Sequence, residues 1–189
     1  MRFANPFNPQ SALRNPQSAI MKILGIDPGL ERTGYGVIET LDGAPGAMRL
    51  LEAGVVRTSA KDALAARLAE IHSGLAAVLA EFRPDAVAVE ELYSHYRHPR
   101  TAILMGHARG IVFLAAAEVG VPVTSYGATH IKKALVGSGH ASKHQVQRAI
   151  QSHFGLKKAP EPADVADALA VALCHAHRAA RSAIKNAGK

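Results

Sequence analysis

Alternating apolar and polar positions near the start of the chain predict three short strands. The apolar run KILGID occupies residues 22–27 and is followed by a turn at PGLER. The alternating segment TGYGVIET covers residues 33–40, and LLEAGVVRT covers residues 50–58. Because short turns join these segments, we expect the three strands to pair antiparallel.

A helical period follows these strands. From residue 62 to residue 82, leucine and isoleucine recur three or four positions apart, up to an Arg-Pro-Asp breaker. The next apolar segment, DAVAVEEL at 85–92, is short, and because it follows a long helix it can run parallel to the first strand.

The rest of the chain alternates between helices and one more strand. We expect a helix over 100–119, a strand over 121–126, helices over 128–136 and 142–154, and a last helix from about residue 163. The resulting order, βββαβαβα, predicts an α/β domain: a ribonuclease H-like fold with a mixed five-stranded sheet flanked by helices.

The ends of the chain lack this patterning. The sequence NPQSA occurs twice within residues 1–20, among three prolines, so we expect a disordered extension there. Because a second methionine, Met21, opens the patterned part, an upstream start-site artefact is one explanation of the extension. The prediction is one domain over residues 21–183 and a flexible tail over 184–189, in keeping with the length of 189 residues.

The composition of the chain bears on membrane association and on the cellular compartment of the protein. Uninterrupted apolar stretches such as residues 110–117 are shorter than the ~20 residues that cross a bilayer, so no membrane association is expected. Cys174 is the single cysteine, and no secretory segment opens the chain. Both features predict a protein of the reducing cytoplasm.

Positive charge points to nucleic acid as the partner. Lys and Arg number 22 against 15 Asp and Glu, which gives a net charge of +7. No acidic residue occurs between residues 128 and 160, a segment that contains Lys132, Lys133, Lys143, Arg148, Lys157 and Lys158. Two merely solvated helices would normally mix signs, so this segment predicts a phosphate-binding face, with Ser142 as the N-cap of its second helix.

Four carboxylates occupy positions suited to chemistry. Asp27 and Glu90 each close an apolar strand, and they come within metal-bridging reach if those strands are parallel neighbours. Each also has a structural interpretation: Asp27 as a cap of its own turn and Glu90 as an ordinary strand-end charge. Glu91 is the rival of Glu90, but strand alternation points it to the opposite face.

The other two carboxylates lie three residues apart on the last helix, within PADVADALAVALCHAH. Asp164 has a structural alternative, since an acid in the first turn is favoured by the helix dipole. Asp167 lies deeper among alanine and leucine, with no Lys or Arg within one turn, so it needs a cation or a hydrogen-bond partner.

Together these acids predict a metal-dependent phosphodiester hydrolase. Hard oxygen ligands suit Mg²⁺ or Mn²⁺ and not zinc. Two such ions would activate a water and stabilise the attacking and leaving oxygens at phosphorus. A zinc site at Cys174, His175 and His177 is disfavoured because three ligands at i, i+1 and i+3 cannot all face one ion, and a buried thiol with two polar-face histidines is preferred.

At this point the chain resembles a known family, the RuvC Holliday-junction resolvases. The resemblance runs from residue 21 to about residue 181 and rests on ILGIDPGLERTGYGVIE, AVEELY, GSGHASKHQVQ and ADVADALAVALCHAH in that order. It implies that the catalytic carboxylates are Asp27, Glu90, Asp164 and Asp167, that Lys132 and Lys143 approach the active site, and that Tyr93 is the family's aromatic residue.

The resemblance also implies substrate and partners: a homodimer acting on four-way junction DNA, two Mg²⁺ ions per subunit, and cooperation with the RuvA and RuvB branch-migration proteins. The basic segment YSHYRHPR adds Tyr93, Tyr96, Arg97 and Arg100 as candidate DNA contacts. The helix with Ile103, Met105, Gly106, Gly110 and Ile111 is the candidate dimer interface, and ordinary core packing is the alternative.

Two other classes of function stay open from sequence. A catalytically inert junction-binding protein would share the basic face, but it would have little reason to keep four acids. A sugar kinase or actin-like ATPase also begins with a strand, an Asp and a Gly-rich hairpin. Those folds repeat the unit in two domains, which a chain of 189 residues is too short to hold.

Overall fold

The computed structural model describes residues 20–41, 46–92 and 99–187. The predicted extension before Ile20 and the candidate DNA contacts Tyr93, Tyr96 and Arg97 therefore lie outside the described residues.

One mixed sheet of five strands forms the centre of the domain. The strands are β1 (Lys22–Asp27), β2 (Arg32–Thr40), β3 (Met48–Arg57), β4 (Ala86–Glu90) and β5 (Val123–Tyr126), in the order β3-β2-β1-β4-β5. The first three pair antiparallel, and β4 and β5 run parallel to β1. The antiparallel pairing and the parallel β4 predicted from the sequence are confirmed.

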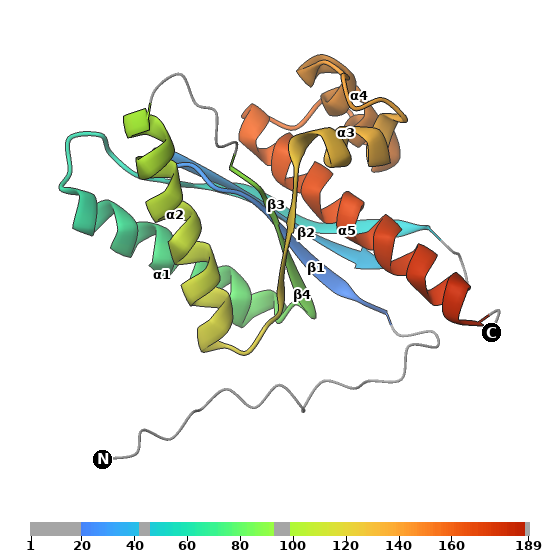
Figure 1. Cartoon of the computed structure of the whole chain (residues 1–189), viewed down its shortest axis with the longest axis horizontal. Coiled ribbons are helices and arrows are strands. Elements are labelled where there is room, and N and C mark those ends of the chain that lie inside the picture. Colours follow the sequence, from blue (N-terminus) through green and yellow to red (C-terminus); the bar gives the residue numbers. More distant parts are fainter. Residues whose placement is uncertain (1–19, 42–45, 93–98, 188–189) are drawn as a thin grey trace, which may run out of the picture.

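Helices cover both faces of this sheet (Figure 1). On one face lie α1 (Leu64–Phe82) and α2 (Pro99–Glu118), packed on a cluster that includes Leu24, Ile71 and Val112. On the other face lie α3 (Ala128–Val136), α4 (Lys143–His153) and α5 (Ala163–Ala187). The two layers give the domain a hydrophobic cluster on each side of the sheet.

Three glycines let α5 lie unusually close to β1 and β2. A Cβ on Gly25 would overlap the carbonyl oxygen of Ala168, and a Cβ on Gly34 would overlap that of Asp164. At Gly36 the Cβ would come 2.5 Å from Leu169 Cδ2. The backbone of α5 therefore rests directly on the backbone of the sheet, which sets the height of the acidic side chains near its first turns.

Predicted and observed boundaries differ mainly at the helix ends. The first helix begins at Leu64 rather than Asp62, because the Asp62 amide is bonded to Ser59 O in a turn and Ala63 is extended, with φ −58° and ψ 144°. The last helix continues to Ala187, so helical backbone reaches into the segment predicted as a tail.

Helix α2 contains a long apolar segment, much of it exposed. By length and composition alone, its segment Arg100–Glu118 could cross a membrane, with a mean hydropathy of 1.2. A mean hydropathy includes charged residues, whereas the stretches considered in the sequence analysis contain no charged residues. One of them, Arg109, donates to Glu90 O at 3.3 Å and to Ser125 Oγ at 2.7 Å, which ties α2 to the sheet.

Candidate active site

Two carboxylates meet where parallel strands end. Asp27 is the last residue of β1 and Glu90 the last of β4, and the two strands are neighbours with Ile26 opposite Val89. The two strands are therefore parallel neighbours, as the sequence-based prediction that Asp27 and Glu90 meet requires. Both side chains line one cavity of about 300 Å³.

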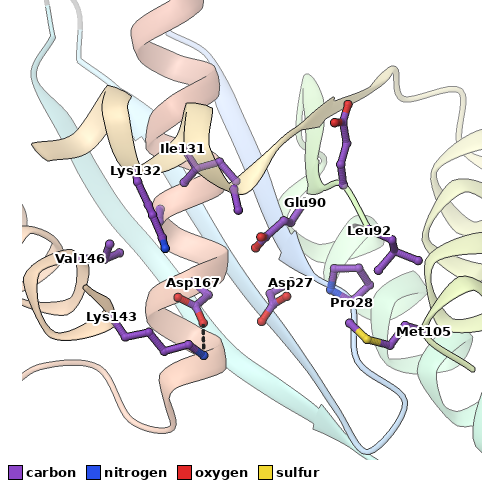
Figure 2. A pocket seen from close by; sticks show the side chains of 13 residues that line it. Asp27, Pro28, Glu90, Leu92, Met105, Ile131, Lys132, Lys143, Val146 and Asp167 are labelled. Atoms are coloured by element: carbon purple, nitrogen blue, oxygen red, sulfur yellow. Dashed lines mark ion pairs between the residues drawn. The ribbon is translucent and has the colours of Figure 1, made fainter. Parts of the chain in front are cut away.

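Helix α5 brings the other two acids to the same edge. Asp167 lines the cavity with Asp27 and Glu90 (Figure 2). Asp164 is not among the lining residues; it forms an ion pair with Arg32, with 3.4 Å between Arg32 Nε and Asp164 Oδ2. Both acids nevertheless raise the pKa of Asp27 through their charge, so all four carboxylates belong to one electrostatic cluster.

Two lysines approach this cluster from α3 and α4. Lys132 and Lys143 both line the cavity, and Lys143 Nζ lies 3.7 Å from Asp167 Oδ2 (Figure 2). Lys143 is held at the start of α4 by a capping box. Ser142 Oγ accepts from the Gln145 amide at 3.3 Å, and the Gln145 side chain accepts from the Ser142 amide at 2.8 Å. The predicted N-cap at Ser142 is confirmed.

Burial and mutual repulsion keep these carboxyls from ionising readily. The pKa of Asp27 rises to about 7, first because the group is buried, then because of Glu90, Asp167 and Asp164, against a smaller opposing effect of Lys143. Burial also raises the pKa of Glu90 and of Asp167, while Lys143 lowers both. The cluster carries more negative charge than Lys132 and Lys143 neutralise.

The chemistry of the donors fits a hard divalent cation. All four acids offer carboxylate oxygens, and a cation between them would relieve the repulsion that raises the pKa of Asp27. Among the residues that the structure describes, no three His, Cys, Asp or Glu side chains are already gathered into a closed metal-binding group. Arg32 and Lys143 instead pair with Asp164 and Asp167.

Other predicted site residues lie farther from the cavity. Lys133, Arg148 and Arg100 are exposed, but none of them lines it. Glu91 does line it, beside Leu92, with its Oε2 directed at Gly127, 3.5 Å from where a Cβ would be. Sequence reasoning missed Arg32 as the partner of Asp164, although its place at the start of the strand that follows the Asp27 turn was an available signal.

Cys174, His175 and His177, the residues of the disfavoured zinc site, have contacts that explain them as structural residues. Cys174 lies on α5 and is fully buried in the core, and burial raises its pKa to about 11, so the predicted buried thiol is confirmed. The two histidines are half-buried rather than on a polar face as predicted. The physical reason at His175 is a 2.9 Å hydrogen bond between its Nδ1 and Tyr126 OH, and His177 packs edge-on to His153.

Stability of the metal-free protein should depend on Asp27. Burial and the neighbouring acids raise the pKa of Asp27 in the folded protein from its ordinary 3.8 to about 7, so folding is favoured while the group is protonated and this advantage is lost as pH rises from about 4 through 7. Asp27→Asn removes this loss. In EDTA we expect the variant to exceed the unmodified protein in melting temperature by about 10 °C at pH 8, corresponding to about 3 kcal/mol.

The same comparison at pH 5 provides the control, because Asp27 is then largely protonated in the fold and the difference should shrink to a few degrees. Scanning calorimetry at the two pH values measures both differences. An equal difference at pH 5 and pH 8 would contradict the assignment of a raised pKa to Asp27.

Comparisons with known proteins place these features in a family. A family model described as crossover junction endodeoxyribonuclease RuvC matches residues 23–175, a range that contains all four carboxylates. A crossover junction endodeoxyribonuclease RuvC of Rhodopirellula baltica is 53% identical over 152 residues, which cover 80% of this chain and 84% of that protein. The protein of the same name from Paramagnetospirillum magneticum is 46% identical over 158 residues, or 83% and 92% of the two chains.

A solved structure shows the same fold. The chain resembles T. thermophilus RuvC in complex with a Holliday junction substrate with a TM-score of 0.80 and 45% identity, covering 86% of this chain and 97% of that one. This likeness confirms the ribonuclease H-like fold predicted from the order of the elements.

Proposed function

The chain belongs to the RuvC family of crossover junction endodeoxyribonucleases, and from this premise we propose that it resolves Holliday junctions by symmetric nicking of two opposed strands in DNA recombination and repair. The observation that carries the proposal is the convergence of Asp27, Glu90 and Asp167 in one cavity beside Lys132 and Lys143. Buried acids facing cations at a strand edge are the arrangement expected for phosphodiester hydrolysis.

The proposed cofactor is Mg²⁺, two ions per subunit, with Mn²⁺ as a substitute. Asp27, Glu90, Asp164 and Asp167 would hold it. When bound, the metal would activate water and neutralise charge that develops at phosphorus. The support for this proposal is the all-oxygen donor set and the pKa of Asp27, raised to about 7 by burial and by the neighbouring acids.

The chain's own residues have separable tasks in this proposal. Lys132 and Lys143 bind the non-bridging oxygens of the scissile phosphate, and Lys143 exchanges its pair with Asp167 for that contact. Pro28, Leu92 and Met105 form an apolar wall on the same cavity and limit the access of bulk water. Base stacking by Tyr93 and Tyr96 and a DNA contact by Arg97 stay predictions, because these residues lie outside the described part of the chain.

A two-fold dimer is part of the proposal, since paired nicks on a nearly two-fold junction need two active sites. Its interface would be α2, where Ile103 is 61% exposed and Leu114 is 49% exposed. Gly106 and Gly110 have open space beside them, which permits close approach of a second helix. Two other residues of the predicted interface are turned inward: Met105 lines the cavity and Ile111 packs on the core.

We expect Leu114→Glu to separate the dimer. A buried, unpaired carboxylate at the interface is costly, so light scattering should show monomer at micromolar protein, and junctions should receive single rather than paired nicks. Leu64→Glu is the matched control: Leu64 is 37% exposed on α1, and a glutamate in a first turn suits the helix dipole. If Leu114→Glu stays dimeric, this face of α2 is not the dimer interface.

Partners and location complete the proposal. Family membership supports cooperation with RuvA and RuvB, and an interaction with DNA together with a single buried thiol at Cys174 supports the cytoplasm.

The central test uses a synthetic mobile four-way junction and a linear duplex of matched sequence, each with Mg²⁺ or EDTA. Symmetric nicks on the junction alone, absent in EDTA, are the expected result. Tight junction binding without nicks in Mg²⁺ or Mn²⁺ would indicate a binding module instead. Equal cutting of both DNAs would indicate a general nuclease without junction selectivity.

A further inference from the structure

Two arginines stand directly opposite each other at the active-site edge of the sheet. Arg32 opens β2, Arg57 closes β3, and the two are paired in the strand register. Directly opposite residues of antiparallel strands point to the same face, with Cβ atoms about 5 Å apart. Like charges in this relation destabilise a sheet unless an anion lies between them.

Neighbouring acids only partly compensate this charge. Arg32 pairs with Asp164 at 3.4 Å, and its side chain remains 53% exposed. Arg57 is exposed and, within the described part of the chain, is in no ion pair. Glu161 lines a groove with Arg57, yet the same groove is lined by Leu156, which precedes the exposed Lys157 and Lys158. Among the described residues, the two arginines share a single ion pair, so the charge of Arg57 is not neutralised by a direct contact.

The register places the pair beside the carboxylates. Asp27 is paired with Gly34, and Gly34 with Val55, so Arg32 and Arg57 lie two residues farther toward the edge. Arg57 is two strand spacings across and two residues along from Asp27, about 12 Å. In the sheet order, the arginines and Glu90 lie on opposite sides of Asp27. A short run of one DNA strand can therefore span from the carboxylates to the arginines.

We propose that Arg32 and Arg57 bind a backbone phosphate of the substrate DNA next to the phosphate that is cleaved. The inference rests on the proposed nuclease function and adds to it a contact on the β3 side of the active site. Guanidinium groups suit this task because their planar fork matches phosphate oxygens in a bidentate manner. The bound phosphate would neutralise the repulsion between the two arginines, and it would position the strand without touching the reacting atoms.

The test measures junction binding by the full-length protein in EDTA, where no cleavage is expected, by fluorescence anisotropy over a range of salt concentrations. Arg57→Gln is expected to raise Kd by about 3- to 10-fold and to reduce the slope of log K against log salt by about one unit for each contacting protomer. Arg57→Lys keeps the charge and should retain the slope, although it loses the bidentate geometry.

Arg49→Gln is the matched control. Arg49 lies near the other end of β3, exposed, and pairs with Glu39 at 2.6 Å, far from the active-site edge. Its removal should leave both Kd and the salt slope unchanged. In Mg²⁺ with saturating enzyme, Arg49→Gln should nick junctions within about twofold of the unmodified rate, since Arg49 lies outside the proposed contact.

The outcomes separate the two proposals. Failure of the unmodified protein to bind or nick junctions would overturn the proposed function itself. If the unmodified protein binds and nicks junctions but Arg57→Gln has the same salt slope as the unmodified protein, the proposed phosphate contact alone would be overturned. A slope reduced equally by Arg49→Gln would also overturn it, because the effect would then reflect net charge rather than this site.

Discussion

Asp27→Asn is expected to lower the rate of junction nicking by about 10³-fold or more at saturating Mg²⁺. Asp27 has the central place in the cluster, because its pKa alone is raised by the charges of Glu90, Asp167 and Asp164 together. Asparagine keeps the shape of the side chain and one oxygen but removes the negative charge. The loss should therefore fall on chemistry, with junction binding in EDTA unchanged or tighter.

Single-turnover nicking of the synthetic junction measures this effect. Glu91→Gln is the matched control, because Glu91 directly follows Glu90 but directs its carboxylate toward Gly127. This control should retain activity within a few-fold. If Glu91→Gln lost activity and Asp27→Asn did not, the assignment of the acids to this edge would be wrong.

Gly25→Ala is expected to cost about 3 kcal/mol of unfolding free energy, or to prevent folding. A Cβ at this position would overlap Ala168 O and would come 2.7 Å from Ala172 N, both backbone atoms of α5 that cannot move aside alone. Relief requires α5 to rise from β1, which also displaces Asp164 and Asp167 from Asp27. Nicking should therefore fall together with stability, and urea unfolding followed by circular dichroism measures the change.

Gly110→Ala in α2 is the matched control for this prediction. No atom lies within 4 Å of a Cβ at Gly110, and alanine in a helix is favoured over glycine by up to about 1 kcal/mol. Because Gly110 lies on the proposed dimer interface, both variants are compared in the Leu114→Glu monomer, where the unfolding free energy of Gly110→Ala should stay the same or rise slightly. Equal costs at Gly25 and Gly110 would mean that the close contact between α5 and the sheet does not stabilise this fold.

Chain-local patterns were enough to predict the elements and their pairing. The period-two segments around residues 22–58 became β1 to β3, and the apolar run after the first helix became the parallel strand β4. The sequence predicted that Asp27 and Glu90 meet if their strands are parallel neighbours, and the pairing of β1 with β4 meets that condition. The cap at Ser142 was equally readable, because capping depends on residues only three positions apart.

The ion pairs within the site could not be predicted from local sequence patterns. Arg32 and Asp164 are 132 positions apart, and Lys143 and Asp167 are on different helices. The same holds for Arg32 opposite Arg57, which needs the exact register of β2 on β3. Such contacts depend on how whole elements are placed, and one residue of register shift would turn every side chain to the other face.

By itself, then, the sequence determined the elements and the mixed sheet and indicated the four acids as candidates, because periodicity, breakers and strand ends are properties of neighbouring residues. Tertiary structure alone decided how near α5 lies to the sheet, that Asp164 pairs with Arg32, and which face of α2 stays exposed. The physical reason is that these features arise from close packing and desolvation between distant segments, and both depend on distances that no local pattern encodes.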